Sequence, residues 1–358
     1  MTEKKKQEIV IVGNIIEARR VAGGASGKAG GLLALWAFPQ QIVPLSFNLH
    51  QELANEYNGE QEWGYRRVNT VGVDGDIQQQ STSTKKLRLP KDLDWLRPEV
   101  LHEWSTLGGP DTTAQVHPYK FTNFLLKKTL ESDGVDLIIG KVTKIETDPE
   151  DGTAIGVEYT PKDQDAPVKL TGDHIVLTLG PWTSKILPSC PISGLRAHSI
   201  TISPTRQLSA NALFTELRVS RTKIVSPEVY PRKDEVYVCG EGDTLAPVPE
   251  STDDVEVVKE KCDELFKYAS AISEQLQDGR ILRRQACYLP IVDKPSYTGP
   301  FIGETNIHGL YLASGHSCWG INNAPGTGKV MSEIILEGRA KSARLDGLEA
   351  DSFDACLD

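Results

Sequence analysis

The segment "IVIVGNIIEARRVAGGASGKAGG" (Ile9–Gly31) opens like a nucleotide-binding α/β unit and then departs from that pattern. Ile9 to Val12 form an apolar, β-branched run that ends at Gly13, which is typical of the first strand of such a unit. A Gly-rich turn and a helix should follow, with an acidic residue for the ribose hydroxyls about 20 residues further on. Here Glu17 follows Gly13 after only three residues. The helix whose N-terminus would hold a pyrophosphate is therefore missing from the sequence.

Three residues are too few for the ordinary connection between parallel strands. A crossover between parallel neighbours needs about a dozen residues or more. We therefore expect "IVIVG" and "IIEA" to form either one long strand or a hairpin that turns at Gly13–Asn14, and not two neighbouring parallel strands.

Two further segments are rich in glycine. "GGASGKAGG" (Gly23–Gly31) would let backbone N–H groups approach an anion closely, although its composition also suits a surface loop. In "SGHSCWGINNAPGTGK" (Ser314–Lys329), residues 326–328 are predicted to precede a helix that begins near Lys329, so that free N–H groups would face a ligand. His316 in this segment is either a candidate base or a structural histidine.

The order of the remaining elements predicts an α/β domain that the chain leaves and then re-enters. Residues 118–132 have the spacing of an amphipathic helix, and residues 141–160 have the pattern of a hairpin with its turn at 148–152. "HIVLTLG" is a near-continuous apolar strand, as in a parallel sheet covered on both faces. Alternating strands at 197–242 indicate a mixed or antiparallel sheet, and one long helix is expected at 252–277.

Composition excludes several classes of function. The chain has 358 residues, enough for about two domains, and its net charge of −10 argues against binding to nucleic acid. Its most apolar stretch is too short for a transmembrane segment. The six cysteines contain no CxxC pair and suit neither a zinc site nor a disulfide framework, so we expect no metal and a reducing, cytoplasmic location.

Three motifs, taken together, resemble those of one family. "GASGKAGG", "HIVLTLGPWT" and "GLYLASGHSCWGINNAPGTGK" are similar in order and spacing to the FAD-dependent oxidoreductases of the D-amino-acid oxidase, glycine oxidase and sarcosine oxidase superfamily, and most similar to a fungal branch of it. The resemblance covers about residues 9–340. It implies an α/β fold class in which an FAD/NAD(P)-binding, Rossmann-like domain, truncated at its first βαβ unit, is interleaved with a mixed-sheet α+β substrate domain.

The resemblance also implies domain limits and a cofactor, FAD. The FAD-binding domain would comprise residues 1–64, 115–195 and 285–342, the substrate domain residues 65–114 and 196–284, and the C-terminal tail residues 343–358. Some positions are expected at the adenosine end of FAD, namely Glu17 at the ribose, Arg19 or Arg20 and Val142 at adenine, and Gly180 to Trp182. Others are expected along the pyrophosphate and flavin, namely Ala25, Ser26, Gly30, Gly31, Gly315, His316, Ile321, Gly326, Thr327 and Gly328. The helix near Lys329 would point its positive end at the flavin.

The implied reaction is oxidation of a C–N bond in a small amine or amino acid by hydride transfer to flavin, with oxygen as the acceptor. Relatives that oxidise amino acids often place an arginine near the Gly-His turn to hold the substrate carboxylate, and Cys318 stands there instead; Arg283, Arg284 or Lys329 could replace it. Cys287 lies where sarcosine-oxidase relatives bond a cysteine to the flavin, and the alternative is a buried structural thiol.

The missing turn and helix leave two explanations open. One is an error in the gene model, with an intact oxidase in the cell. The other is a flavin-deficient pseudo-enzyme or scaffold on the same fold, with a protein partner and a role in endosomal trafficking. Loss of the N–H groups that would hold the pyrophosphate would weaken FAD binding by several kcal/mol, at roughly 1.5–3 kcal/mol for each charge-assisted hydrogen bond.

Overall fold

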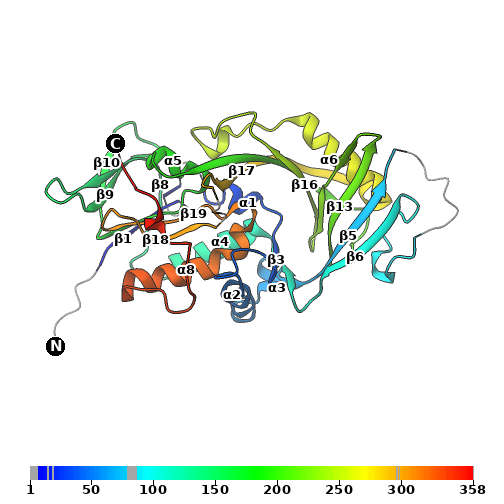
Figure 1. Cartoon of the computed structure of the whole chain (residues 1–358), viewed down its shortest axis with the longest axis horizontal. Helices are drawn as coiled ribbons and strands as arrows, with labels where there is room; N and C mark the ends of the chain where they lie inside the picture. Colours follow the sequence, from blue (N-terminus) through cyan, green and yellow to red (C-terminus); the bar gives the residue numbers. More distant parts are fainter. Residues whose placement is uncertain are drawn as a thin grey trace.

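The computed structural model describes residues 7–13, 16–17, 20–78, 87–295, 297 and 299–357. Two large sheets dominate these residues, and Figure 1 shows them at opposite ends of the molecule with long strands running between them. The first sheet has the order β10-β9-β8-β2-β1-β11-β19-β18. Its strands are β1 (Ile9–Val12), β2 (Ile16–Glu17), β8 (Ile138–Thr147), β9 (Ala154–Pro161), β10 (Val168–Thr171), β11 (His174–Leu177), β18 (Phe301–Glu304) and β19 (Leu310–Ser314).

The five central strands of this sheet, from β8 to β19, are parallel. Ile175 and Leu177 on β11 are fully buried, which confirms the prediction of a covered parallel strand in "HIVLTLG". The hairpin predicted at 141–160 is also confirmed, since β8 and β9 pair antiparallel.

The prediction that "IVIVG" and "IIEA" cannot be parallel neighbours is wrong. β2 lies beside β1 in parallel, and the register joins Val12 to Ile16. A crossover must be long because the chain normally returns to the start of the first strand. Here β2 begins level with the last residue of β1, and a single residue pair joins the two strands. The chain therefore needs no long return to the start of β1.

The second sheet is mixed. Its order is β17-β12-β16-β15-β13-β5-β6, with β14 paired to β13, and only the β13–β5 pair is parallel. This confirms the mixed sheet predicted for the middle of the chain. The strands are β5 (Asn69–Asp76), β6 (Leu101–Gly108), β12 (Ile192–Ser203), β13 (Asn211–Ser220), β14 (Lys223–Val225), β15 (Glu228–Pro231), β16 (Val236–Asp243) and β17 (Arg280–Val292).

One long helix at 252–277 was expected to cover this sheet, and the segment is interrupted. Helix α6 spans Lys259–Ile272, and a short α7 (Glu274–Gln277) follows it. Ser273 between them is fully buried, and its extended backbone interrupts the helical hydrogen bonds. The apolar stripe of α6 nonetheless packs into the core of the sheet, as its spacing predicts.

A small third sheet and several helices complete the fold. The sheet joins β3 (Leu32–Ala34), β7 (Thr113–Gln115) and β4 (Arg66–Arg67). The helices are α1 (Ala25–Lys28), α2 (Val43–Glu56), α3 (Gly59–Glu62), α4 (Pro118–Leu130), α5 (Thr183–Ile186) and α8 (Gly320–Glu337). Short 3₁₀ turns lie at Lys91–Leu93, Gly180–Trp182, Thr252–Asp254, Ser317–Trp319 and Ala350–Ser352. Helix α4 confirms the prediction at 118–132.

The division into two interleaved domains stays a prediction. Strand β12 runs across the expected limit at 195/196, and β17 runs across the limit at 284/285. Residues 343–357 pack onto the first sheet, where Leu348 and Ala350 are buried and Glu349 bridges to Ile302 on β18. Across the described ranges, none of the helices has both the length and the apolar composition to cross a bilayer.

Candidate cofactor and substrate site

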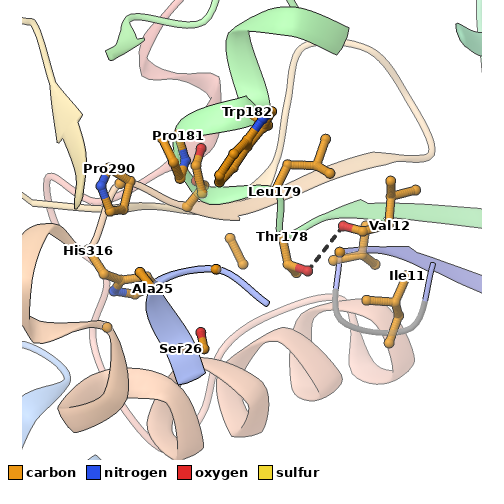
Figure 2. Close-up of a pocket in the computed structure, with 18 of the residues that line it drawn as sticks. Ile11, Val12, Ala25, Ser26, Thr178, Leu179, Pro181, Trp182, Pro290 and His316 are labelled. Atoms are coloured by element: carbon orange, nitrogen blue, oxygen red, sulfur yellow. Dashed lines mark hydrogen bonds between the residues drawn. The ribbon is translucent and has the colours of Figure 1, made fainter. Parts of the chain in front are cut away.

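A cavity of about 860 Å³ lies between the first sheet, α8, α1 and the Gly180–Trp182 turn. Figure 2 shows Ala25, Ser26 and His316 on one side of its centre and Thr178, Val12 and Ile11 on the other. The three Gly-rich or apolar motifs that are distant in sequence therefore line one space. Thr178 fixes the end of β1 here, because its Oγ1 donates a hydrogen bond to the Val12 carbonyl at 3.1 Å.

Ten of the predicted cofactor residues line this cavity. They are Ala25, Ser26, Val142, Gly180, Trp182, Gly315, His316, Ile321, Thr327 and Gly328. Arg20 pairs with Asp253 at 3.1 Å and is not among the lining residues. Arg19 and the side chain of Glu17 lie outside the described residues.

Gly30, Gly31 and Gly326 do not line the cavity, and close packing accounts for them. A Cβ on Gly30 would lie 2.6 Å from the Tyr230 ring, and one on Gly326 would lie 2.9 Å from Ser46 of α2. Gly31 has a φ of +89°, which favours glycine. These glycines permit close packing next to the cavity, and their contact with FAD stays a prediction.

The start of the last helix was also predicted in the wrong place. α8 begins at Gly320, about nine residues before Lys329, and it contains residues 326–328 within its length. The N–H of Gly326 donates to Ser46 Oγ at 3.0 Å instead of pointing at a ligand. The positive end of α8 still meets the cavity, since Gly320 and Ile321 both line it.

His316 is a neutral group in this site. Burial lowers its pKa to about 4. Its Nε2 lies 3.4 Å from Thr327 Oγ1, and its buried Nδ1 finds no hydrogen-bond partner in the described part of the chain. The ring is therefore suited to hydrogen bonding with a ligand and is a weak base at neutral pH.

Two histidines, His50 and His316, predict that the free energy of unfolding falls in acid. Burial lowers the pKa of His50, like that of His316, to about 4 from 6.5. Between these values the unfolded chain binds more protons than the folded chain, so the free energy of unfolding falls as the pH drops from 6.5 towards 4. Fully buried His50 is expected to cost roughly 2–3 kcal/mol at pH 4.5, and His316, which is partly exposed in the cavity, less than that.

Urea unfolding at pH 7 and pH 4.5 measures this loss. The variant His316→Asn should lose less stability than the parent chain, and the variant of the exposed His308, His308→Asn, should lose as much as the parent. Equal losses in the parent and in His316→Asn would contradict the prediction.

Two lysines and a glutamate lie at the Val142 end of the cavity. Lys141 and Lys185 both pair with Glu250, Lys141 at 2.8 Å, and all three residues line the space. The cluster carries a net positive charge, which suits an anionic ligand. Thr252 also lines the cavity, and its buried Oγ1 has no hydrogen-bond partner among the described residues.

Cys287 lies on β17, and it is 5 % exposed and not among the lining residues. Burial raises the pKa of its thiol to about 11, so it is protonated at neutral pH. A covalent bond to a flavin needs the thiolate. The covalent link stays a prediction that this geometry does not favour.

The sequence analysis missed several lining residues. Lys141, Lys185, Glu250 and Thr252 come from ordinary polar segments, and no local motif marks them. Leu289 and Pro290 reach the cavity from the end of β17. Only the tertiary fold brings these residues, from strands, a helix and a loop, to one cavity. Among the described side chains, no group of three or more His, Cys, Asp and Glu is placed to hold a metal ion.

The opposite wall of the cavity is apolar. Ile9, Ile11 and Val176 project from β1 and β11, and Met331 and Ile335 face them from α8. Ile9 is 41 % exposed, which is unusual for a central strand of a parallel sheet. A connecting helix would normally cover this face, and the chain has only three residues between Gly13 and Glu17.

The family model described as "DAO: FAD dependent oxidoreductase" matches residues 14–334. "Putative oxidoreductase TDA3" of Saccharomyces cerevisiae is 43 % identical, with 96 % of this chain and 89 % of that protein covered. "Putative oxidoreductase C1F5.03c" of Schizosaccharomyces pombe is 36 % identical, with 94 % and 89 % covered. The Saccharomyces alignment has 468 positions against 358 residues here, so at least 110 positions (the excess of 468 over 358) face gaps in this chain.

Solved structures share the fold at low identity. Glycine oxidase from Bacillus cereus has a TM-score of 0.70 at 18 % identity, over 95 % of this chain and 100 % of that one. A modified fructosyl peptide oxidase from Aspergillus nidulans has a TM-score of 0.70 at 16 % identity, over 98 % and 96 %. The fold therefore matches these proteins over nearly its whole length.

Proposed function

This chain belongs to the DAO family of FAD-dependent oxidoreductases, and from that membership we propose that it oxidises the C–N bond of a small amine or amino acid, with FAD taking the hydride and oxygen as the final acceptor. The observation that carries the proposal is the convergence of three distant motifs on one cavity of about 860 Å³. That volume lies in the usual range for cofactor and ligand sites, about 300–1,000 Å³.

The residues around this cavity fit a flavin nucleotide. His316 Nδ1 and Thr252 Oγ1 are buried polar atoms without protein partners, and both belong to lining residues. A Cβ on Gly180 or Gly328 would meet no atom within 4 Å, so open space lies against both backbones. Buried polar atoms are nearly always satisfied, which supports a ligand in contact with them.

When bound, FAD would accept a hydride from the carbon next to nitrogen and pass the electrons to oxygen, after which the product imine would hydrolyse. The protein's part is to bind, orient and exclude water. The Gly320 end of α8 directs its positive dipole into the cavity, where negative charge is favoured. Neutral His316, held near Thr327 Oγ1, offers a hydrogen bond without adding charge.

At the phosphate end of the site, FAD binding is expected to be weakest. The Gly-rich turn and helix that normally supply N–H groups there are absent from the chain. Lys141 and Lys185 lie at the Val142 end, where adenine is expected, and with Glu250 they leave one net positive charge that attracts the phosphates over a longer range. We therefore expect measurable FAD binding that weakens with added salt.

The direct test is a titration of the purified chain with FAD, followed by the flavin absorption spectrum and by calorimetry. Saturable binding followed by bleaching of the flavin with an amine would support the proposal. A folded chain that leaves the FAD spectrum unchanged at millimolar cofactor would overturn it.

A variant that fills the cavity sharpens this test. Gly328→Leu is expected to keep the fold, because leucine is a better helix former than glycine by up to about 1 kcal/mol and the site has room. Its side chain would occupy the space of the ligand, so FAD affinity should fall at least about tenfold, a loss of roughly 1.4 kcal/mol. Gly328→Ala is the matched control with a much smaller effect. Undiminished FAD binding in Gly328→Leu would place the cofactor elsewhere.

The second candidate function is a flavin-deficient scaffold on the same fold, which binds a protein partner and works in endosomal trafficking. The exposure of the apolar Ile9 on a central strand, at 41 %, favours it. Peroxide formation with any amine would count against this alternative. For either function we propose a cytoplasmic location, which is in keeping with six cysteines that form no disulfide.

A further inference from the structure

Glu228 is a partly buried carboxylate without a cationic partner. It begins β15, and its Oε2 accepts hydrogen bonds from Tyr230 Oη at 2.5 Å and from Cys239 Sγ at 3.5 Å. Within the described part of the chain, no lysine or arginine forms an ion pair with it. Burial raises its pKa. A carboxylate in such surroundings is costly to ionise unless a cation is brought to it.

A series of aromatic rings leads to this carboxylate. Trp319 contacts Trp36 at 5.5 Å between ring centroids, Trp36 contacts Phe214 at 6.0 Å, and Phe214 contacts Tyr230 at 5.9 Å. Trp36 is 40 % exposed, so part of its ring is open to a ligand. The buried Nε1 of Trp319 has no hydrogen-bond partner in the protein. We call these four rings and Glu228 the aromatic–acid cluster.

The aromatic–acid cluster adjoins the cavity. Ser317 and Cys318 line the cavity, and Trp319 follows them in the same 3₁₀ turn. Glu228 on β15 is the register partner of Phe214 on β13, and Phe214 contacts Trp36, which contacts Trp319. Glu228 is therefore near the end of the cavity that holds the Gly315–His316 turn.

The charge at this end has the wrong sign for a carboxylate substrate. Cys318 stands where an arginine was expected for amino-acid substrates. Two of the possible replacements are engaged elsewhere, because Arg284 pairs with Asp263 at 2.7 Å and Lys329 pairs with Glu333 at 3.2 Å. A cation brought beside Glu228 would favour its ionised form and would also be attracted by the ring faces, whereas a substrate carboxylate would gain neither interaction.

We propose that the aromatic–acid cluster binds the cationic nitrogen of a substrate that carries no carboxylate. This inference rests on the proposed function and narrows its substrate class from amines and amino acids to cationic amines. Glu228 supplies the charge, and the exposed ring of Trp36 supplies a face for the alkyl groups on nitrogen.

The test measures ligand binding directly. Benzyltrimethylammonium keeps its charge at every pH and cannot be oxidised, so its binding to the full chain reports recognition alone. We expect calorimetry and tryptophan fluorescence to show binding at least tenfold tighter than that of the neutral isostere neopentylbenzene or of phenylglycine, which carries a carboxylate. Phenylglycine binding as tightly as the ammonium probe would overturn the proposal.

Variants test whether the ammonium probe binds at Glu228. Glu228→Gln should weaken binding of the ammonium probe about tenfold or more, and Glu228→Asp should retain part of it. Glu216→Gln, at an exposed position on the neighbouring strand β13, should bind it like the parent. If Glu228→Gln does not fold, Trp36→Ala takes its place and should also weaken binding. Unchanged affinity in a folded Glu228→Gln or Trp36→Ala variant would overturn the proposal.

Failure of this inference is separable from failure of the proposed function. If the ammonium probe binds as expected but FAD does not bind, the inference about the aromatic–acid cluster is supported and the oxidase proposal is wrong. If an amino acid bleaches bound FAD while the ammonium probe does not bind, the oxidase proposal stands and this inference is wrong.

Discussion

Insertion of a Gly-rich turn and a helix, about 20 residues in all, between Gly13 and Ile16 is expected to tighten FAD binding by about 10²–10⁴-fold. The turn and the first helical residues would direct N–H groups at the pyrophosphate. Two charge-assisted hydrogen bonds at roughly 1.5–3 kcal/mol each amount to about 3–6 kcal/mol, which corresponds to that range.

The inserted helix would pack against the apolar wall of the cavity. Ile9, Ile11 and Val176 on the sheet and Met331 and Ile335 on α8 form this wall, and the 41 % exposed Ile9 would gain cover from an amphipathic helix. The same insertion should therefore raise the thermal midpoint of unfolding as well as the affinity for FAD.

The control is an insertion of equal length in which the glycines of the turn are replaced by valine. It should restore the apolar cover, and thus stability, but not the affinity, because a Cβ at these positions keeps the phosphate away from the backbone. If both insertions bind FAD no better than the parent chain, the missing segment does not explain a weak site. Reading the genomic DNA around codon 13 tests the gene-model explanation separately, since an intron that encodes a Gly-rich turn and helix would support it.

The substitution Arg232→Ala is expected to lower the free energy of unfolding by about 3–5 kcal/mol, which is typical when one member of a buried ion pair is removed. Arg232 is 7 % exposed and pairs with Glu235 at 2.7 Å. Its guanidinium also donates hydrogen bonds to the carbonyls of Ala29 and Gly30, and it lies over the Tyr237 ring at 4.9 Å. Alanine would leave the largely buried Glu235, among the described residues, with His117 at 3.4 Å as its remaining ion-pair partner.

Urea unfolding at pH 7 measures this loss. Arg206→Ala is the matched control, because Arg206 forms an exposed pair with Asp94 at 2.9 Å and such pairs contribute at most about 1 kcal/mol. Equal losses in the two variants would contradict the prediction. Since Arg232 holds the backbone that follows α1, Arg232→Ala should also loosen the Gly-rich wall of the cavity.

Much of the fold could be predicted from local pattern. The apolar run of β11, the turn between β8 and β9, and the spacing in α4 each depend on residues near one another in sequence. The sequence-based prediction was wrong where contacts between distant segments decide the local structure. Gly326–Gly328 look like a turn by composition, but packing against Ser46 of α2 holds them within α8.

The sequence by itself determined the family, the apolar strands, and the absence of the first Gly-rich turn and helix. Only the tertiary structure decided that β2 pairs with β1, that Lys141, Lys185, Glu250 and Trp182 line one cavity, and that Tyr230 and Cys239 donate to Glu228. The physical reason is that hydrogen-bond periodicity and backbone conformation act over a few residues, whereas burial and charge depend on which distant segments meet.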